Sequence, residues 1–533
     1  MRLGIDFGTT RIAVAAADRG NYPIVTFDGP DETSWDWFPP FVALRGQERI
    51  YGFEAWSAQA DPDWVLVRSL KRLLADASLT ESVRVGDVEL AVHQTIIEMA
   101  SALKNALMTA STLRPSGTAS IEVMLGVPAN ANTNQRFLTA DAFQRAGFTV
   151  LGMLNEPSAA SIELGHTHKS APAAPNRVLV YDFGGGTFDA SLVVLDGDLH
   201  SVVGTSGLGA LGGDDFDEIL ADLSLDKAGL GLERLSAAES LWLDEECRRK
   251  KEGLHPNSRR VTIDLGLLRS DWAEVSVPVA EYYERCLPLL DRTLALVDNL
   301  VLTHGVPVRG AAGPGRGLDI VYVTGGGSEL PLVARRLRER YGRIVRRSAH
   351  PRGATAIGLA IQADGRSGYT LRDRFTRHFG VWRERQDGAS SAFDVIFAKG
   401  TPLPARGERP LAAQRRYHPA HNIGHFRFLE CSDLGKDDAP AGDVTTWNEI
   451  RFAFLPELED AERLEDRVVE RSARAAQQLI EESYSCDATG IVHVRLSNVS
   501  NNTSRVFQLA RWGTHPASTR SARRRPKTGN RTK

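Results

Sequence analysis

The chain has 533 residues, of which 42% are hydrophobic and 25% charged, as is ordinary for a soluble globular protein of several domains. No apolar run approaches the roughly 18 residues of a membrane-spanning helix, and the first residues, MRLGIDFGTT, contain no apolar signal-peptide core. The four cysteines lie far apart in sequence, which argues against a disulfide framework or a structural zinc site. We therefore expect a cytoplasmic protein without membrane contact.

The net charge of −3 is unevenly distributed along the chain. Residues 511–533 carry eight Lys or Arg and no acidic residue, so the rest of the chain is distinctly acidic. An acidic body is not typical of a nucleic-acid-binding protein. The basic tail is predicted to be a solvated, disordered end, and contact with nucleic acid or an acidic partner through it is the alternative.

Three glycine-rich turns, each preceded by a short apolar run, punctuate the first 365 residues. In 2–18 and in 177–198, an apolar run ends in an aspartate (Asp6, Asp182), followed by Phe-Gly, small residues, Thr and a second apolar run. This pattern predicts two β-hairpins and a weak internal duplication. The third turn, in 319–337, is followed by apolar residues at helical spacing, which predicts a strand, a tight turn and a helix.

Between these turns, helical periodicity alternates with short apolar runs. Helices are expected at 94–108, near 236–252 and at 281–302, where Pro288 predicts a kink or a boundary. Strands are expected at 120–127 and 261–265. The alternation predicts an α/β fold for this part of the chain.

The pattern changes after a polar break at 363–368. Short runs with a period of two residues follow, most of them separated by Gly, Pro, Asn or Asp, and they predict an all-β sandwich. The runs are 379–385, 393–400, 423–430, 449–455, 490–497 and 505–510. The highly charged residues 457–475 are compatible with either a short helix or a solvated loop.

The first two glycine-rich turns could hold phosphate groups, because bunched backbone N–H groups bind anions and glycine allows close approach. One cradle would be Gly8, Thr9 and Thr10, and the other Gly184, Gly185, Gly186 and Thr187. Asp6 and Asp182 lie where a hydrated Mg²⁺ would sit, and Asp189 could orient or deprotonate a water molecule. Together these features predict an ATP-binding cleft between two α/β lobes.

These motifs resemble, in order, those of the heat-shock protein 70 (DnaK-like) chaperone family, which has the actin-like ATPase fold. GIDFGTT (4–10) and YDFGGGTFD (181–189) resemble its two phosphate motifs, and VTGGGSELP (323–331) resembles its adenosine motif. Further matching segments are WVLVRSLKRLLAD (64–76), LGVPANANTNQR (125–136), LNEPSAASIELG (154–165), GALGGDDFD (209–217) and HPRGATAIGLAIQA (350–363). IFAKGTPLP (396–404), HNIGHFRFLECS (421–432) and CDATGIVHV (486–494) follow the order of the family's peptide-binding β-sandwich.

The resemblance implies a role for individual residues. Lys71 would position the attacking water, and Glu156, Asp182 and Asp189 would organise Mg²⁺ and that water. Asp6 and Asp182 would hold Mg²⁺ through water. The nucleotide contacts would be Gly8, Thr9, Thr10, Gly184, Gly185, Gly186, Thr187, Gly212, Gly213, Arg248, Lys251, Gly325, Gly326 and Gly327.

The resemblance also implies a domain division: an actin-like two-lobed ATPase domain at 1–364, a linker at 365–375, a peptide-binding-like β-sandwich at 376–510 and the tail at 511–533. Several positions depart from the family pattern. Glu329 and Glu252 stand where basic adenosine-contacting residues are expected, and the linker lacks the usual acidic, leucine-rich character. Gly424 falls at the family's central peptide-pocket valine, and no segment for a helical lid follows Ala510.

The leading functional prediction is an ATP-hydrolysing, chaperone-like protein that couples its nucleotide state to the binding of unfolded or extended polypeptide. The resemblance implies a J-domain co-chaperone and an exchange factor as further partners. The alternative is a nucleotide-dependent scaffold that binds one dedicated protein partner with little ATPase activity. A small-molecule kinase and an actin-like filament former share the fold, but the C-terminal sandwich argues against both.

Overall fold

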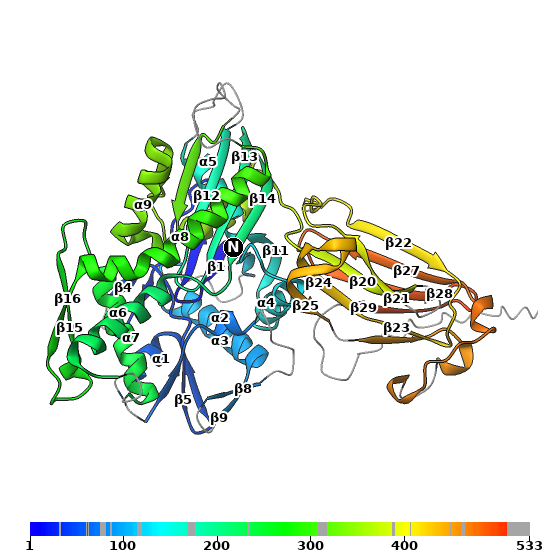
Figure 1. The fold of residues 1–533 in the computed structure, drawn as a ribbon, viewed down its shortest axis with the longest axis horizontal. Helices are drawn as coiled ribbons and strands as arrows, with labels where there is room; N and C mark the ends of the chain where they lie inside the picture. Colours follow the sequence, from blue (N-terminus) through cyan, green and yellow to red (C-terminus); the bar gives the residue numbers. More distant parts are fainter. Residues whose placement is uncertain are drawn as a thin grey trace, which may run out of the picture.

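The protein is described by a computed structural model, in which an α/β part (blue to green) lies beside a β-rich part (yellow to red; Figure 1). The described residues are 1–30, 33–59, 61, 63–74, 82–85, 88–113, 120–168, 176–231, 235–306, 317–385, 390–405, 407–447, 449–459 and 464–508. The predicted order of an α/β part followed by an all-β sandwich is confirmed. The basic tail lies outside the described residues.

The first lobe is built on a four-stranded sheet in the order β11-β10-β1-β2. The first predicted hairpin is present, because β1 pairs antiparallel with β2 and Asp6 lies opposite Ala13. Strands β10 and β11 extend the sheet in parallel. The strands are β1 (Arg2–Phe7), β2 (Ile12–Ala16), β10 (Glu122–Val127) and β11 (Thr149–Asn155). Side chains on both faces of β1 and β2 are buried, which explains why these strands are almost continuously apolar.

The second lobe is built on a six-stranded sheet in the order β18-β17-β12-β13-β14-β19. Its centre repeats the first lobe, since the predicted hairpin β12–β13 is again extended by a parallel strand, β17. This repetition agrees with the predicted internal duplication. The strands are β12 (Asn176–Phe183), β13 (Phe188–Asp196), β14 (Leu199–Leu208), β17 (Ile320–Thr324), β18 (Val345–Arg347) and β19 (Thr370–Arg372).

Helices cover these sheets and join the two lobes. Helices α5 and α10 pack on each other so closely that a Cβ at Gly358 would lie 1.9 Å from the carbonyl oxygen of Ala159. Their buried side chains share one core with residues of both hairpins, such as Ala13 and Val178, which holds the two hairpin turns face to face. The larger helices are α3 (Val92–Thr109), α4 (Thr133–Arg145), α5 (Glu156–Thr167), α6 (Gly213–Ala228), α7 (Ala237–Glu252), α8 (Val279–Thr303), α9 (Pro331–Tyr341) and α10 (Ala354–Ala363).

Helix α8 runs through Pro288, so the boundary that proline allowed is not present. Its apolar side chains, including Cys286 and Leu290, are buried on both sides of the proline. Packing of this continuous face outweighs the one backbone hydrogen bond that proline removes.

The smaller elements are α1 (Gly52–Ala58), α2 (Leu70–Leu73), β3 (Phe27–Asp28), β4 (Ser34–Trp35), β5 (Val42–Arg45), β6 (Glu48–Tyr51), β7 (Val65–Val67), β8 (Ser82–Val85), β9 (Val88–Ala91), β15 (Arg260–Asp264) and β16 (Glu274–Pro278).

The C-terminal part has two four-stranded antiparallel sheets, β21-β20-β24-β25 and β22-β27-β28-β29, and a separate hairpin of β23 and β26. The predicted run 423–430 is divided at Arg427, because β23 and β24 belong to different sheets. Three short 3-10 turns and loop segments, without an α-helix, form the described residues of 457–475. The strands are β20 (His378–Arg385), β21 (Ser390–Phe397), β22 (Leu411–Tyr417), β23 (Ile423–Phe426), β24 (Phe428–Leu434), β25 (Pro440–Thr446), β26 (Ile450–Ala453), β27 (Ile480–Cys486), β28 (Val492–Asn498) and β29 (Thr503–Gln508).

The sandwich packs against the first lobe near α4. Glu430 on β24 accepts hydrogen bonds from the backbone N–H of Thr133, at 3.1 Å, and from its hydroxyl group. The connecting segment contributes β19, which pairs in parallel with β14, and Asp373, which accepts a 2.9 Å hydrogen bond from Nδ2 of Asn155. The segment predicted to be a linker therefore lies against both lobes.

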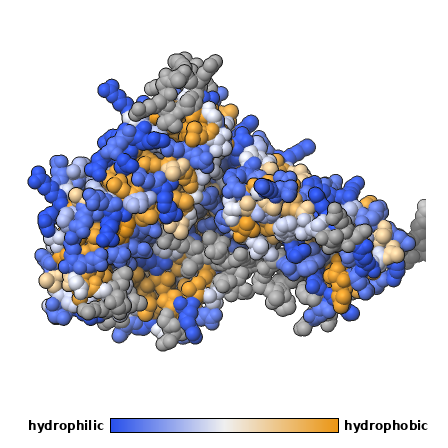
Figure 2. All heavy atoms as spheres, in the orientation of Figure 1, coloured by the Kyte–Doolittle hydropathy of each residue, from blue (hydrophilic) through white to orange (hydrophobic). Residues whose placement is uncertain are grey.

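The helices and the surface of the described residues were compared with those expected of a membrane-spanning chain. None of the helices there is long and apolar enough to cross a bilayer. In the view of Figure 2, hydrophobic side chains are scattered in separate patches over a mainly hydrophilic face.

Candidate functional site

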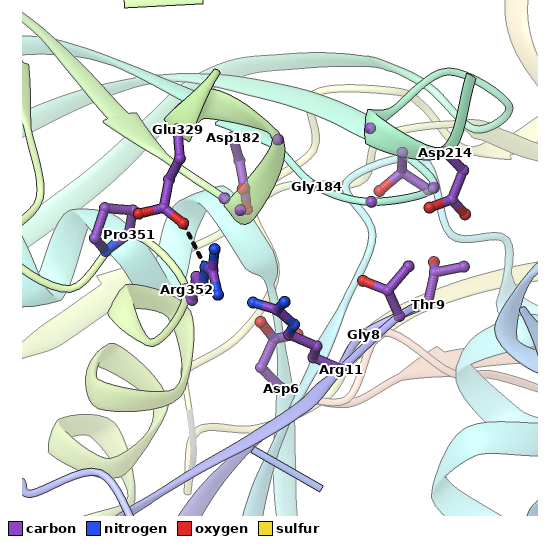
Figure 3. A pocket seen from close by; sticks show the side chains of 18 of the residues that line it. Asp6, Gly8, Thr9, Arg11, Asp182, Gly184, Asp214, Glu329, Pro351 and Arg352 are labelled. Carbon is purple, nitrogen blue, oxygen red and sulfur yellow. Dashed lines mark hydrogen bonds and ion pairs between the residues drawn. The ribbon is translucent and has the colours of Figure 1, made fainter. Parts of the chain in front are cut away.

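A pocket lies between the two lobes, at the turns of the two predicted hairpins (Figure 3). The turn that contains Gly8 faces the turn that contains Gly184. They approach so closely that a Cβ at Gly185 would lie 2.5 Å from the side chain of Thr10, so the contact requires glycine. The structure therefore brings together both predicted phosphate cradles: Gly8, Thr9, Thr10, Gly184, Gly185, Gly186 and Thr187 all line the pocket.

The other predicted glycines complete the wall on the second lobe. Gly213 donates its backbone N–H to the carbonyl oxygen of Gly184 at 2.9 Å, which fixes the start of α6 beside the second cradle. Gly212 does not line the pocket; it lies behind Gly185. Gly325 has φ +83°, and a Cβ there would lie 2.5 Å from Oδ1 of Asp182, so only glycine fits. Gly213, Gly325, Gly326 and Gly327 line the pocket.

Four carboxylates and one ammonium group gather beneath the cradles. Asp6 and Asp182 come from the ends of equivalent strands, β1 and β12, and line the pocket with Lys71 and Glu156. Lys71 is only 6% exposed and forms a buried ion pair with Glu156, the first residue of α5. Asp189 lies behind the wall and accepts a 3.0 Å hydrogen bond from the N–H of Ala129. Position in sequence could not have distinguished Lys71 from a surface lysine.

The pKa values of this cluster reflect an excess of negative charge. Burial, and then the charge of Glu156, raise the pKa of Asp6 and of Asp189 to about 7. The same two causes raise the pKa of Asp182 well above its usual range. Burial alone would lower the pKa of Lys71, but the attraction of Glu156 and Asp6 outweighs it, so the pKa is raised. A cation bound here would relieve the repulsion among the carboxylates.

The donor set fits a hydrated Mg²⁺ better than a fully protein-coordinated metal. Within the described ranges, no three His, Cys, Asp or Glu side chains converge closely enough to hold a metal ion. Mg²⁺ usually keeps several waters and takes only one or two carboxylates together with phosphate oxygens. Asp6 and Asp182, opposite each other at the base of the pocket, fit that requirement.

The two predicted basic contacts on α7 are already paired with protein groups. Lys251 donates to the carbonyl oxygen of Gly213 at 2.6 Å and forms a 2.7 Å ion pair with Asp217. Arg248 lies 3.4 Å from Asp214, which also lines the pocket. Both cations thus hold the start of α6 in position while they face the pocket.

Sequence reasoning missed two arginines that line the pocket, Arg11 beside the first cradle and Arg352 at the opposite end. Arg11 donates to both carboxylate oxygens of Glu252, at 2.8 and 2.7 Å. Arg352 donates to Glu252 at 3.2 Å and also to Glu329. Position in sequence offered a signal, because Arg11 directly follows the first cradle and Arg352 lies just before α10.

Comparison with known proteins gives one consistent result. The family model described as Hsp70 protein matches residues 2–375. The chaperone protein HscA homolog of Methylibium petroleiphilum is 33% identical over 381 residues, which cover 68% of this chain and 57% of that protein. The chaperone protein HscA of Cronobacter sakazakii is 30% identical over 375 residues, with coverages of 68% and 57%. The chain thus matches less than two thirds of the length of these relatives.

Proposed function

The chain belongs to the Hsp70 family, and from that premise we propose that it is an ATP-hydrolysing, chaperone-like protein. One observation carries this proposal: two opposed glycine cradles, two strand-end aspartates and a buried Lys71–Glu156 pair converge on one pocket between two lobes. Phosphoryl transfer depends mainly on positioning and on neutralising charge, and this arrangement can provide both.

Each group of residues has a distinct part in the proposed reaction. The backbone N–H groups of the two cradles hold the phosphates of ATP or ADP, and Thr9, Thr10 and Thr187 add hydroxyl donors. Mg²⁺, held through water by Asp6 and Asp182, would neutralise phosphate charge. Lys71 orients the attacking water, and Glu156 fixes the ammonium group by their ion pair. Asp189 adds a negative charge to the cluster, and the hydrogen bond that it accepts from the N–H of Ala129 fixes the orientation of its carboxylate.

We further propose that the β-sandwich binds extended polypeptide and that the bound nucleotide influences this binding. A short polar path supports such coupling, because Asp373 accepts from Asn155, the residue directly before Glu156. Glu430 makes a second connection between the sandwich and α4. Coupling of this kind requires that the two nucleotide states differ in their affinity for polypeptide. On this proposal, 1–364 is the ATPase domain, 365–375 the linker and 376–510 the polypeptide-binding domain.

A dedicated protein partner is the second candidate for the sandwich, and the surroundings of Gly424 favour it. A Cβ at this buried position would lie 2.4 Å from the ring of Phe454. The space beside this strand is therefore filled by the protein's own aromatic side chain. A partner with a matching surface would bind more readily than generic apolar segments. In either case we propose a cytoplasmic protein, with a J-domain co-chaperone and an exchange factor as further partners.

The test is single-turnover ATP hydrolysis by the full chain, with and without a panel of unstructured apolar peptides. The Lys71→Ala variant serves as the blank, and Lys227→Ala, which removes a lysine from an ion pair outside the pocket, is the matched control. Hydrolysis that peptides accelerate and only Lys71→Ala abolishes supports a coupled chaperone. Hydrolysis indifferent to every peptide supports the dedicated partner, and no hydrolysis by the wild type contradicts the proposed enzyme.

A further inference from the structure

The pocket between the lobes has two chemically different ends. Figure 3 shows Gly8, Thr9 and Gly184 at one end, and Glu329 and Arg352 at the other. The first end carries the cradles, so it suits phosphates, and in this view the strand-end aspartates Asp6 and Asp182 lie between the two ends. A nucleoside joined to those phosphates would extend toward the second end.

Arg352 spans this second end. Its Nε donates to Glu329, which ends the 3-10 turn Gly326–Glu329, and its Nη2 donates to Glu252 at the end of α7, at 3.2 Å. Its side chain also lies on the open face of Gly326, since a Cβ there would come within 3.7 Å of Cγ and 3.9 Å of Nε of Arg352. The guanidinium group therefore fills the space between the two carboxylates, over the third glycine turn.

Two other arginines hold the carboxylates that bind Arg352. Arg11 reaches Glu252 from the first lobe with two hydrogen bonds of 2.8 and 2.7 Å. Arg347, which does not line the pocket, donates a 2.5 Å hydrogen bond to Glu329. Burial alone would raise the pKa of Glu252, but Arg11 and Arg352 outweigh it and lower the pKa, so this carboxylate is ionised at neutral pH. Each carboxylate thus has two guanidinium partners.

A base entering this end would have to displace Arg352 from both carboxylates. Hydrogen bonds between ionised groups are among the stronger ones, and these four side chains are all at least two-thirds buried. No aromatic ring lines the described pocket, so the base would gain no ring stacking in return. The phosphates would enter instead at the glycine turns, where Gly8 and Gly184 donate their N–H groups within the turns, to the carbonyl oxygens of Asp6 and Thr187.

We propose that Arg352 occupies the place of the nucleobase, and that this site binds its ligands through their phosphates with little discrimination among bases. The ligand class is the Mg²⁺ complex of a diphosphate or triphosphate, whichever base it carries. This inference rests on the proposed function, because it concerns the same nucleotide site. It departs from that function in one respect: adenine is not selected.

The test compares four ligands on the full-length protein by isothermal titration calorimetry with excess Mg²⁺: ADP, GDP, CDP and inorganic pyrophosphate. We expect the three nucleotides to have dissociation constants within about threefold of one another, and pyrophosphate to bind within about tenfold of them. A preference of tenfold or more for one base overturns the inference and leaves the proposed nucleotide site intact. Failure of all four ligands to bind contradicts both.

Two arginine variants separate the role of Arg352 from a general loss of charge. Arg352→Ala opens the space over Gly326, so binding of ADP should strengthen at least fivefold relative to pyrophosphate. Arg347→Ala removes the other guanidinium from Glu329 but leaves Arg352 in place, so this ratio should stay unchanged. An unchanged ratio in Arg352→Ala, or an equal change in both variants, overturns the inference. Because both side chains are partly exposed, neither variant should prevent folding.

Discussion

Replacing Asp6 by Asn should stabilise the ligand-free protein and remove its ATP hydrolysis. The carboxylate lies in a cluster with Asp182, Glu156 and Asp189, and the ammonium group of Lys71 offsets part of their repulsion. Asparagine has nearly the same shape but no charge, so it removes repulsion without creating a cavity. The same change removes one of the two aspartates proposed to hold hydrated Mg²⁺.

The magnitude follows from the raised pKa of this group. Burial, and then Glu156, raise the pKa of Asp6 from 3.8 to about 7. A shift of that size corresponds to roughly 4 kcal/mol of destabilisation above pH 7. Because Asp6 shares its protons with neighbouring carboxylates and faces the open pocket, we expect about half of this, ~2 kcal/mol, at pH 8.

The dependence on pH gives the prediction its sign. An acid whose pKa is raised by folding binds more protons in the folded state than in the unfolded state between about pH 4 and 7. The destabilising contribution of Asp6 in the wild type therefore shrinks as the pH falls from 8 through 7 toward 4. The asparagine side chain of the variant has no proton to bind, so the advantage of the variant is full at pH 8 and disappears near pH 4.

The assay is urea unfolding of the full chain at pH 8, 6.5 and 5, without nucleotide and with EDTA. Asp18→Asn, an exposed carboxylate just beyond the same hairpin, is the matched control and should change stability little at any pH. A variant at position 6 that is no more stable than wild type at pH 8 would refute the reasoning. So would an advantage that does not vary with pH.

Three further variants test other contacts. Asp373→Ala removes the acceptor in the linker that binds Asn155, the residue before α5. Stimulation of single-turnover hydrolysis by peptide should fall at least twofold, with basal hydrolysis unchanged. Stimulation equal to that of the wild type contradicts the polar path. Arg383→Ala removes the two 2.6 Å hydrogen bonds that this guanidinium group donates to the fully buried Glu482, which keeps those from Tyr417 and Tyr484. Urea unfolding followed by circular dichroism should show a loss of about 3 kcal/mol, and a loss below 1 kcal/mol refutes this expectation. Glu245→Gln breaks the 2.8 Å ion pair of Glu245 on α7 with Arg68 of the first lobe. Stopped-flow release of a fluorescent nucleotide should then accelerate severalfold, and an unchanged release rate excludes the idea that this ion pair holds the lobes closed over the nucleotide.

Elements that are determined by residues close together in the sequence were predicted correctly. Both hairpins and the strand–turn–helix around Gly325 were predicted correctly, because glycine turns between apolar runs leave few alternatives. The two phosphate cradles followed from the same motifs. Their approach at Gly185 and Thr10 required only that the two hairpins face each other.

Features that depend on distant residues could not be predicted in this way. The run 423–430 alternates without interruption, yet it divides at Arg427, because its halves pair with different strands. Lys71 became a candidate only by resemblance, since its burial depends on Glu156, 85 residues away. Arg11 and Arg352 stand next to predicted motifs, but their shared partner Glu252 comes from a distant part of the chain, so the ion pairs themselves could not be predicted.

The short strand β19 has a consequence for how the chain behaves when its two parts separate. It is one of the two edge strands of the second-lobe sheet and pairs with β14 through Thr370, Leu371 and Arg372. If the sandwich moved away and drew this segment with it, the edge of β14 would be left with unpaired N–H and C=O groups. Exposed strand edges invite pairing with other chains. The contact that joins the two parts therefore also protects the protein against self-association.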